Sequence, residues 1–313
     1  MYIRSGIGMG TVEETGSLQL TNAGQAVGEI REGKRFPFGA NWASFLTEFD
    51  QGRVEGSKAA LQGMLGAADL VGKTLLDVGC GSGIHSLAAR LLNAQVVSFD
   101  FDPLAVACTL SLQKELVSDE PRWQVLEGSA LDREFLKRLG SFDIVYSWGV
   151  LHHTGAMWAS IDNVTRCVAR GGVLFIAIYN DQGWLSHYWR AVKRLYNQNA
   201  LLRWSLIAVH LPYLVLGRWI SRSIRGRLRL DRGMSYWSDA KDWLGGFPFE
   251  VARPEKVTEF LRQRGFILKK LKTCGRRPGC NEFVFSKQAD DSSGKANAFG
   301  ELPAATAPTV SSR

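Results

Sequence analysis

Short apolar runs alternate with stretches of helical spacing between residues 74 and 180. The runs that predict strands lie at 74–79, 94–100, 123–129, 142–149 and 171–180. Each run is apolar almost throughout, which is typical of parallel strands that are buried on both faces. The alternation therefore predicts a doubly wound α/β fold, because right-handed crossovers place helices on both faces of a parallel sheet.

The alternation resumes near the C-terminus. Residues 254–265 read as a helix that opens with Pro254 and closes at Gly265, and residues 266–273 and 281–287 read as two strands. Because only a short turn separates these strands, we expect an antiparallel hairpin at the sheet edge. The complete sheet is then mostly parallel and seven-stranded.

The pattern divides the chain into five expected parts. We expect a flexible N-terminus, a core that begins with helices, a helical insert rich in aromatic and basic residues, the last helix and strands of the core, and a polar tail that is disordered. In the order of the chain, these parts are residues 1–35, 36–180, 181–252, 253–287 and 288–313.

Charge and cysteine usage narrow the class of protein. The net charge is +8, and residues 218–232 hold six arginines against the single acid Asp231. The five cysteines show no metal-ligand spacing and no disulfide framework, so we expect reduced thiols and no metal site. The N-terminus has no apolar signal segment. These features predict a cytoplasmic protein with one strongly basic segment.

A glycine-rich turn follows the first predicted strand. Gly79, Gly81 and Gly83 come after Asp77, and such a turn lets the backbone approach a ligand beside a helix N-terminus. A dinucleotide turn would need glycine where Ile84 stands, which disfavours a NAD-dependent dehydrogenase. The second strand ends in an aspartate, and a carboxylate at that place accepts hydrogen bonds from ribose hydroxyls.

The stretch "LLDVGCGSGIHSLAARLLNAQVVSFDFDP" resembles motif I and the following acidic loop of class I S-adenosylmethionine-dependent methyltransferases, and "FDIVYSWGVLHHTG" agrees in order and spacing. The loop "SWGVLHHT" is similar to that of small-molecule methyltransferases, including those of quinone biosynthesis, and the wider chain resembles a group of bacterial methyltransferase-like proteins. The resemblance implies S-adenosyl-L-methionine as the cofactor. It places the cofactor's methionine part on the glycine turn, its amino group near Asp77, its ribose at Asp100, its adenine beside Phe101 and its methyl end at strand four. The implied binding residues are Asp77, Gly79, Cys80, Gly81, Gly83, Asp100, Phe101, Ser129, Ala130, Ser147 and Trp148.

The acceptor should approach the carboxyl ends of strands four and five. His152 and His153 are the candidates for a catalytic base, because imidazole titrates near neutral pH, and Tyr179 is the candidate for shaping the pocket. Either histidine could instead brace the following helix. The sequence lacks the N/D-P-P-Y/F and Pro-Cys motifs of enzymes that methylate nucleic-acid bases. We therefore expect O- or C-methylation of a small or lipid-like hydroxylated acceptor.

Residues 201–220 form the most apolar segment, but Arg203, His210, Pro212 and Arg218 interrupt it, which disfavours a membrane span. Two interpretations remain open: a helical lid over the site, or a peripheral contact with the inner face of a membrane through residues 201–232. Arginines also bind RNA phosphates, yet no RNA-binding module is recognisable, so nucleic acid is the less favoured partner. A membrane-docked cofactor-binding protein without turnover and an RNA methyltransferase stay as alternative functions.

Overall fold

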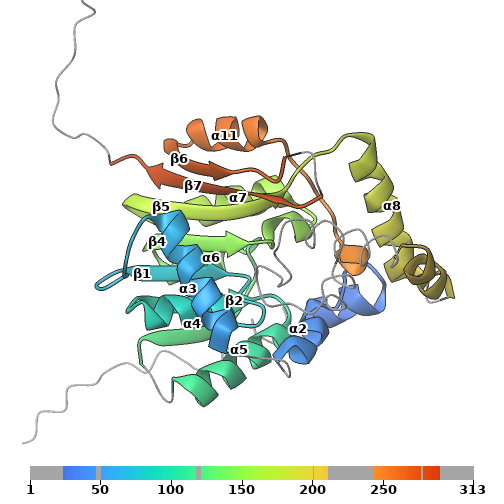
Figure 1. Cartoon of the computed structure of the whole chain (residues 1–313), viewed down its shortest axis with the longest axis horizontal. Helices are drawn as coiled ribbons and strands as arrows, with labels where there is room; N and C mark the ends of the chain where they lie inside the picture. Colours follow the sequence, from blue (N-terminus) through green and yellow to red (C-terminus); the bar gives the residue numbers. More distant parts are fainter. Residues whose placement is uncertain are drawn as a thin grey trace, which may run out of the picture.

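The computed structural model describes residues 24–46, 51–117, 121–199, 201–210, 243–275 and 278–289. Seven strands form one sheet in the order β3-β2-β1-β4-β5-β7-β6 (Figure 1). The strands are β1 (Thr74–Val78), β2 (Gln95–Asp100), β3 (Trp123–Glu127), β4 (Phe142–Trp148), β5 (Val168–Tyr179), β6 (Phe266–Lys272) and β7 (Cys280–Lys287). Strands β1 to β5 pair in parallel, whereas β7 lies antiparallel between β5 and β6. This arrangement confirms the predicted doubly wound sheet and its C-terminal hairpin.

Helices cover both faces of the sheet. In chain order, the helices of the fold include α2 (Phe38–Leu46), α3 (Gln51–Leu65), α4 (Ile84–Leu91), α5 (Pro103–Leu116), α6 (Arg133–Leu139), α7 (Met157–Thr165), α8 (Trp184–Gln198) and α11 (Pro254–Arg262). On one face, apolar side chains of α3, α4 and α5 pack with Leu75 of β1, and on the other those of α6, α7 and α11 pack with Leu76. Neighbouring residues of a strand point to opposite faces, so β1 contributes to both cores.

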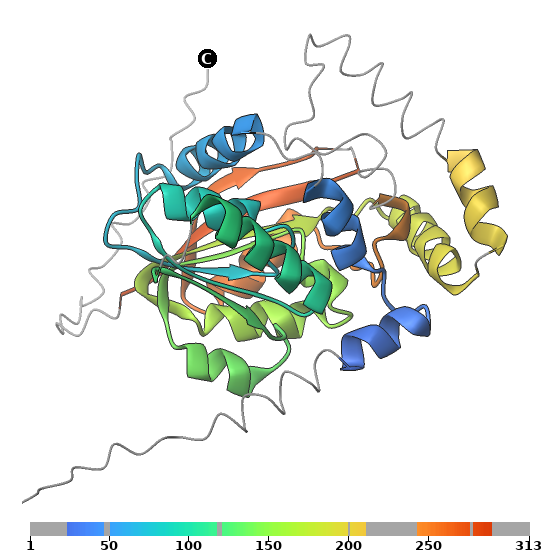
Figure 2. The same ribbon diagram turned by 90° about the horizontal axis from the view of Figure 1, so that it is seen from below.

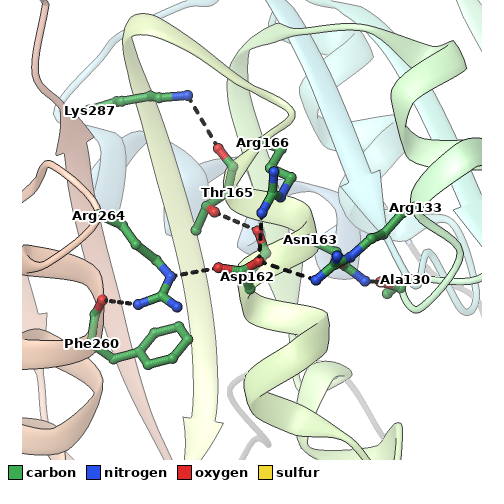
Figure 3. Close-up of polar contacts among 9 residues, drawn as sticks. All are labelled: Ala130, Arg133, Asp162, Asn163, Thr165, Arg166, Phe260, Arg264 and Lys287. Carbon is green, nitrogen blue, oxygen red and sulfur yellow. Dashed lines mark hydrogen bonds and ion pairs between the residues drawn. The ribbon is translucent and has the colours of Figure 1, made fainter.

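An aspartate on α7 ties three elements together on the second face. Asp162 accepts hydrogen bonds from Arg264 at 2.7 Å and Arg166 at 3.1 Å, and Arg133 lies 3.7 Å away (Figure 3). These cations come from the end of α11, the end of α7 and the start of α6. The hydrogen bond from Arg264 contributes most to a lowered pKa of the Asp162 carboxyl. The cluster therefore locks three helical segments against one another at neutral pH.

The neighbouring Asn163 connects this cluster with a loop at the carboxyl edge of the sheet. Its Oδ1 accepts from Arg133 Nε at 2.9 Å, and its Nδ2 donates to the carbonyl of Ala130 at 3.0 Å (Figure 3). Ala130 belongs to the loop after β3, for which the resemblance implies a contact with adenine. The fold thus fixes this loop through a buried side-chain amide.

The structure differs from the sequence-based expectations at two places. Residues 24–31 form a helix, although residues 1–35 were expected to be flexible. Arg35 pairs with Glu29 of this helix at 2.7 Å and donates to the His153 carbonyl at 3.1 Å, which holds the segment to the body. Strand β5 begins at Val168 and not at residue 171, because Val168 pairs with Phe142 of β4. Residues 1–23, 211–242 and 290–313 lie outside the described residues, and with them the whole basic segment 218–232 and most of the expected tail.

Within the part of the chain that the structure describes, no helix combines the length and apolarity needed to cross a bilayer. Helix α8 and residues 201–210, which are also helical, lie beyond the carboxyl ends of the parallel strands (Figures 1 and 2). On their inner side, Trp189 and Tyr196 of α8 pack with Trp243 in one aromatic cluster. This side of the molecule holds the candidate site.

Candidate active site

The glycine turn after β1 adopts a backbone that only glycine accommodates. Gly79, Gly81 and Gly83 have φ angles of 78°, 56° and 79°, in the left-handed region. A Cβ on Gly79 would lie 2.4 Å from Val150 Cγ1, and one on Gly81 would lie 2.9 Å from Trp42 Nε1. The turn therefore exposes bare backbone at the edge of the sheet, next to the N-terminus of α4.

Asp100 at the end of β2 holds this turn. Its Oδ2 accepts from Gly81 N at 2.9 Å, and its Oδ1 accepts from Asp102 N at 2.9 Å. Burial raises the pKa of Asp100 to about 6, against the lowering effect of these two hydrogen bonds. A carboxylate oxygen has two lone pairs, so each oxygen keeps capacity for a ligand hydroxyl.

A buried hydrogen-bond chain orients Asp77. The Trp123 indole N–H donates to Ser98 Oγ at 2.9 Å, Ser98 Oγ and Ser86 Oγ are 2.6 Å apart, and Ser86 donates to Asp77 Oδ2 at 2.5 Å. Ser86 has a single hydroxyl proton, which it donates to Asp77, so Ser98 donates to Ser86 and accepts from the Trp123 indole. Burial nevertheless raises the pKa of Asp77 to about 7. An anionic Asp77 in this setting would gain from a cationic ligand group.

One cavity of about 800 Å³ connects the glycine turn with the ends of β4 and β5. At one end lie the turn, the ends of β1 and β2 and the loop after β3, and at the other end lie aromatic and histidine side chains. Of the residues that the sequence predicted for the site, those lining the cavity are Asp77, Gly79, Cys80, Gly81, Asp100, Phe101, Ser129, Ala130, Trp148, His153 and Tyr179.

Three predicted residues lie behind the wall of the cavity. Gly83 forms the N-cap of α4 and packs near Thr109. Ser147 is fully buried and donates to the Val78 carbonyl at 3.0 Å, so it ties β4 to β1. His152 is fully buried as well, and its Nδ1 accepts from Tyr179 N at 3.3 Å. These residues support the site from outside the cavity.

His153 is the histidine of the pair that reaches the cavity. Its Nδ1 lies 2.6 Å from the Pro248 carbonyl, which only accepts, so Nδ1 carries the proton and Nε2 is left as the acceptor. Burial lowers the pKa of His153 to about 3; the Pro248 hydrogen bond opposes this shift, while the charges of Lys193 and Arg35 add to it. His153 is therefore a neutral hydrogen-bond acceptor near pH 7.

The structure adds residues that the sequence analysis did not assign to the site. From the N-terminal segment, Arg35 lines the cavity with its guanidinium 4.7 Å from the Phe101 ring centre, and it donates to the His153 carbonyl at 3.1 Å. Phe38 and Trp42 of α2 and Trp243 also line it. The sequence predicted helices at the start of the core, which include α2, but nothing in it places Arg35 over Phe101.

Helix α2 reaches the cavity because it docks on the start of α5. Gly39 N donates to Asp102 Oδ2 at 2.7 Å, while Asp102 Oδ1 caps α5 by accepting from Leu104 N at 2.9 Å. A Cβ on Gly39 would lie 2.6 Å from this carboxylate. One aspartate thus fixes both the helix that follows the acidic loop and the helix that covers the cavity.

These residues fit S-adenosyl-L-methionine. The turn brings bare backbone to the cavity wall, Asp77 offers a carboxylate for an ammonium group, and Asp100 offers one for ribose hydroxyls. Phe101 offers a flat apolar face beside them. Together these groups suit a nucleoside that carries an amino-acid tail. Ile84 stands where a turn that binds pyrophosphate has its last glycine.

Comparisons with known proteins agree with this fit. Residues 76–174 match the family model described as "Methyltransferase domain". The chain is 32% identical over 111 residues to the tRNA U34 carboxymethyltransferase of Enterobacter sp. (strain 638), covering 35% of this chain and 33% of that protein. It is 34% identical over 113 residues to the ubiquinone biosynthesis O-methyltransferase of Xanthomonas oryzae pv. oryzae (strain PXO99A), covering 36% and 45%.

Among solved structures, the magnesium protoporphyrin IX methyltransferase from Synechocystis PCC 6803 with bound S-adenosylhomocysteine aligns with a TM-score of 0.47 and 14% identity, covering 76% of this chain and 84% of that one. The chain spans about a third to under half the length of the curated relatives named above. The matched segment, 76–174, contains the glycine turn, Asp100 and the histidine pair. This segment of the chain therefore matches the methyltransferase-domain family, and it is the part of the fold that builds the cofactor end of the cavity.

Proposed function

We propose that this protein transfers the methyl group of S-adenosyl-L-methionine to an oxygen or carbon of a small or lipid-like hydroxylated acceptor. The observation that carries the proposal is the continuous cavity, which joins the cofactor cradle to His153 and Tyr179. A methyl transferase needs both ligands in one water-poor space, because the reaction is an in-line displacement that depends on alignment.

Aromatic side chains build the acceptor end. Tyr179 lies 5.5 Å from Trp243 and 5.2 Å from Phe249 between ring centres, and Trp148 lines the same cavity. Such walls exclude water and favour a flat or apolar acceptor. The buried Lys193 lies 6.0 Å from the Tyr179 ring centre and places a cation beside this end, whereas Arg35 in the cavity wall is paired with Glu29 at 2.7 Å.

The chemistry at this end follows from His153. The bound cofactor supplies a methyl group that is already activated, so the chain's own residues mainly position the acceptor. In the proposed complex, His153 Nε2 accepts the hydrogen bond of the acceptor hydroxyl, and the Pro248 carbonyl holds the ring by its other nitrogen. With a pKa of about 3, His153 is a weak base, which suits an acidic hydroxyl such as a phenol better than an aliphatic alcohol.

A second candidate function is methyl or carboxymethyl transfer to tRNA. The observation that favours it is the match between residues of this chain and enzymes named tRNA U34 carboxymethyltransferase. Against it stands the aromatic lining of this end of the cavity by Trp148, Tyr179 and Trp243, which offers few groups for reading a base edge.

One assay separates these candidates. The purified full chain is incubated with methyl-labelled donor and, in parallel, a lipid extract, a polar small-molecule fraction and total tRNA, and labelled products are identified by mass. We expect label in a hydroxylated compound, and we expect His153→Gln to lower its turnover about a hundredfold. His187→Gln, on the exposed side of α8, is the matched control. Label in tRNA alone would favour the second candidate, and cofactor binding with no labelled product would contradict both.

A further inference from the structure

Helix α8 has one broad apolar sector, and only part of it is covered. Its inner side packs Trp189, Val192 and Tyr196 into the aromatic cluster beside the cavity. Its outer side exposes Trp184, Tyr188 and Leu195, at positions i, i+4 and i+11. At 100° per residue these three side chains fall within a sector of about 40°, so they form one stripe along the helix.

The helical residues 201–210 repeat this arrangement. Leu206 and Ile207 pack against the aromatic cluster, whereas Leu201, Trp204 and Val209 are 86%, 71% and 71% exposed. The exposed side of this segment consists of Leu201, Leu202, Trp204, Ser205, Ala208 and Val209, and carries no charge. A helix that is apolar all round is ordinarily buried in protein or in lipid. We call these exposed residues of 201–210, with the stripe of α8, the outer face.

The two parts of the outer face belong to one unit. Tyr188 on α8 lies 2.6 Å, between its hydroxyl and Nε2, from His210 at the end of the second helix. Arg203 donates to the Tyr196 carbonyl at 3.2 Å and lies over the Tyr196 ring. Both helices project at the same end of the molecule (Figures 1 and 2).

The charge around the outer face has one sign. From residue 182 to residue 230 the sequence contains no aspartate or glutamate. Among the described residues of that stretch, the cations are Arg190, Lys193, Arg194 and Arg203, and Arg190 and Arg194 are exposed on α8. A helix that only needed to stay soluble would interleave both signs of charge. Tryptophan beside apolar residues, with arginine alone as the charged partner, is the composition of helices that lie in an anionic lipid interface.

We propose that the outer face docks on the surface of an anionic lipid bilayer, with Trp184, Leu201, Trp204 and Val209 in the interface and the arginines on lipid head groups. The docking is independent of the proposed reaction. RNA binding through the same arginines would not use Leu201 or Val209, since neither side chain offers charge or a stacking surface to a nucleic acid. A bilayer uses both the apolar and the basic parts of the surface.

The test is flotation of the full-length protein with vesicles of phosphatidylcholine alone and of phosphatidylcholine with a quarter phosphatidylglycerol. We expect binding to the anionic vesicles that weakens as salt rises. The triple variant Leu201→Ser, Trp204→Ser, Val209→Ser should lower the partition coefficient about a hundredfold, because three large side chains leave the interface. The matched control is Val71→Ser with Leu110→Ser, two exposed apolar positions outside the outer face, and it should bind like the parent.

A second readout identifies the residues in contact with lipid. Vesicles with bromine-labelled acyl chains quench tryptophans that enter the interface, and the quenched fraction should fall in Trp204→Phe. Three results would overturn the proposal. The parent protein could fail to float, the triple variant could float like the parent, or Trp204→Phe could leave quenching unchanged. A triple variant that converts a dimer to a monomer, without vesicle binding by the parent, would assign the outer face to a second copy of the chain instead.

Discussion

Protonation of Asp77 should control the affinity for the cofactor. Burial raises its pKa to about 7, although the Ser86 hydroxyl donates to it. The α-amino group of S-adenosylhomocysteine stays mostly protonated at and below pH 7. The proposed contact between this ammonium group and Asp77 therefore needs the carboxylate form, which acidification removes.

The size of the effect follows from the pKa. A carboxyl with a pKa near 7 is about half ionised at pH 7 and about 1% ionised at pH 5, so the dissociation constant should weaken about fiftyfold, or about 2.3 kcal/mol. Titration calorimetry with S-adenosylhomocysteine at pH 5, 6 and 7 measures this change, with circular dichroism to show that the protein stays folded. Asp100, whose pKa is raised to about 6, titrates in the same window and adds to the loss.

Variants separate the two carboxyls. Asp77→Asn should weaken binding at pH 7 and leave only the shallower pH dependence of Asp100. Ser86→Ala removes the donor that lowers the pKa of Asp77, so the affinity at pH 7 should fall about tenfold and the midpoint should move to higher pH. Ser98→Ala, one step farther along the chain of hydrogen bonds, should have the smaller effect. An affinity that is flat from pH 5 to pH 7, or equal pH profiles for Asp77→Asn and the parent, would refute the reasoning.

Replacement of the buried Asp77 carboxyl should stabilise the ligand-free protein. Its folded pKa is raised above the ordinary 3.8, so the native state binds more protons than the unfolded chain between pH 4 and 7. By linkage, the stability that this group contributes falls as pH rises through that window. Asp77→Asn should therefore raise the melting temperature of the ligand-free protein at pH 8 while it weakens ligand binding; a lower melting temperature would contradict the assigned burial.

Three other changes test parts of the site. Asn163→Ala should weaken cofactor binding severalfold, because it frees the Ala130 loop, with the loss appearing in calorimetry and not in the melting temperature alone. Gly81→Ala should abolish measurable binding, since a Cβ would meet Trp42 in a backbone of positive φ; binding at the parent's affinity would show that the turn can rearrange. Asp162→Asn should lower stability by about 1 kcal/mol at pH 7 and by less at pH 3, because a carboxyl with a lowered pKa stabilises fully above its ordinary value of 3.8 and loses that contribution as pH falls; equal losses at both pH values would contradict this.

The periodicity of the chain predicted the sheet well. Runs of buried apolar residues such as those of β1 and β4 leave few alternatives to parallel strands. The positions of the glycine turn and of Asp100 were predictable as well, because they depend on local backbone and on the end of a strand. Strand β5 began earlier than predicted because its first residues take their partner from β4, which the local pattern of residues 166–170 does not contain.

Contacts between distant parts of the chain could not be predicted from the sequence. The bond from Gly39 to Asp102 spans 63 residues and brings α2 over the cavity. Arg35 reaches the His153 carbonyl across 118 residues. The choice between His152 and His153 likewise depends on which ring points into the cavity, and adjacent identical residues carry no signal for that.

The central claim is that the turn at 79–83 and the carboxylate of Asp100 bind the adenosyl cofactor. Titration calorimetry of the full-length protein with S-adenosylhomocysteine at pH 7.5 tests it most directly, with Asp100→Ala as the paired variant. The account predicts one molecule bound per chain and an affinity at least tenfold weaker in the variant. No heat of binding from the folded protein, or the same affinity in both proteins, would contradict it.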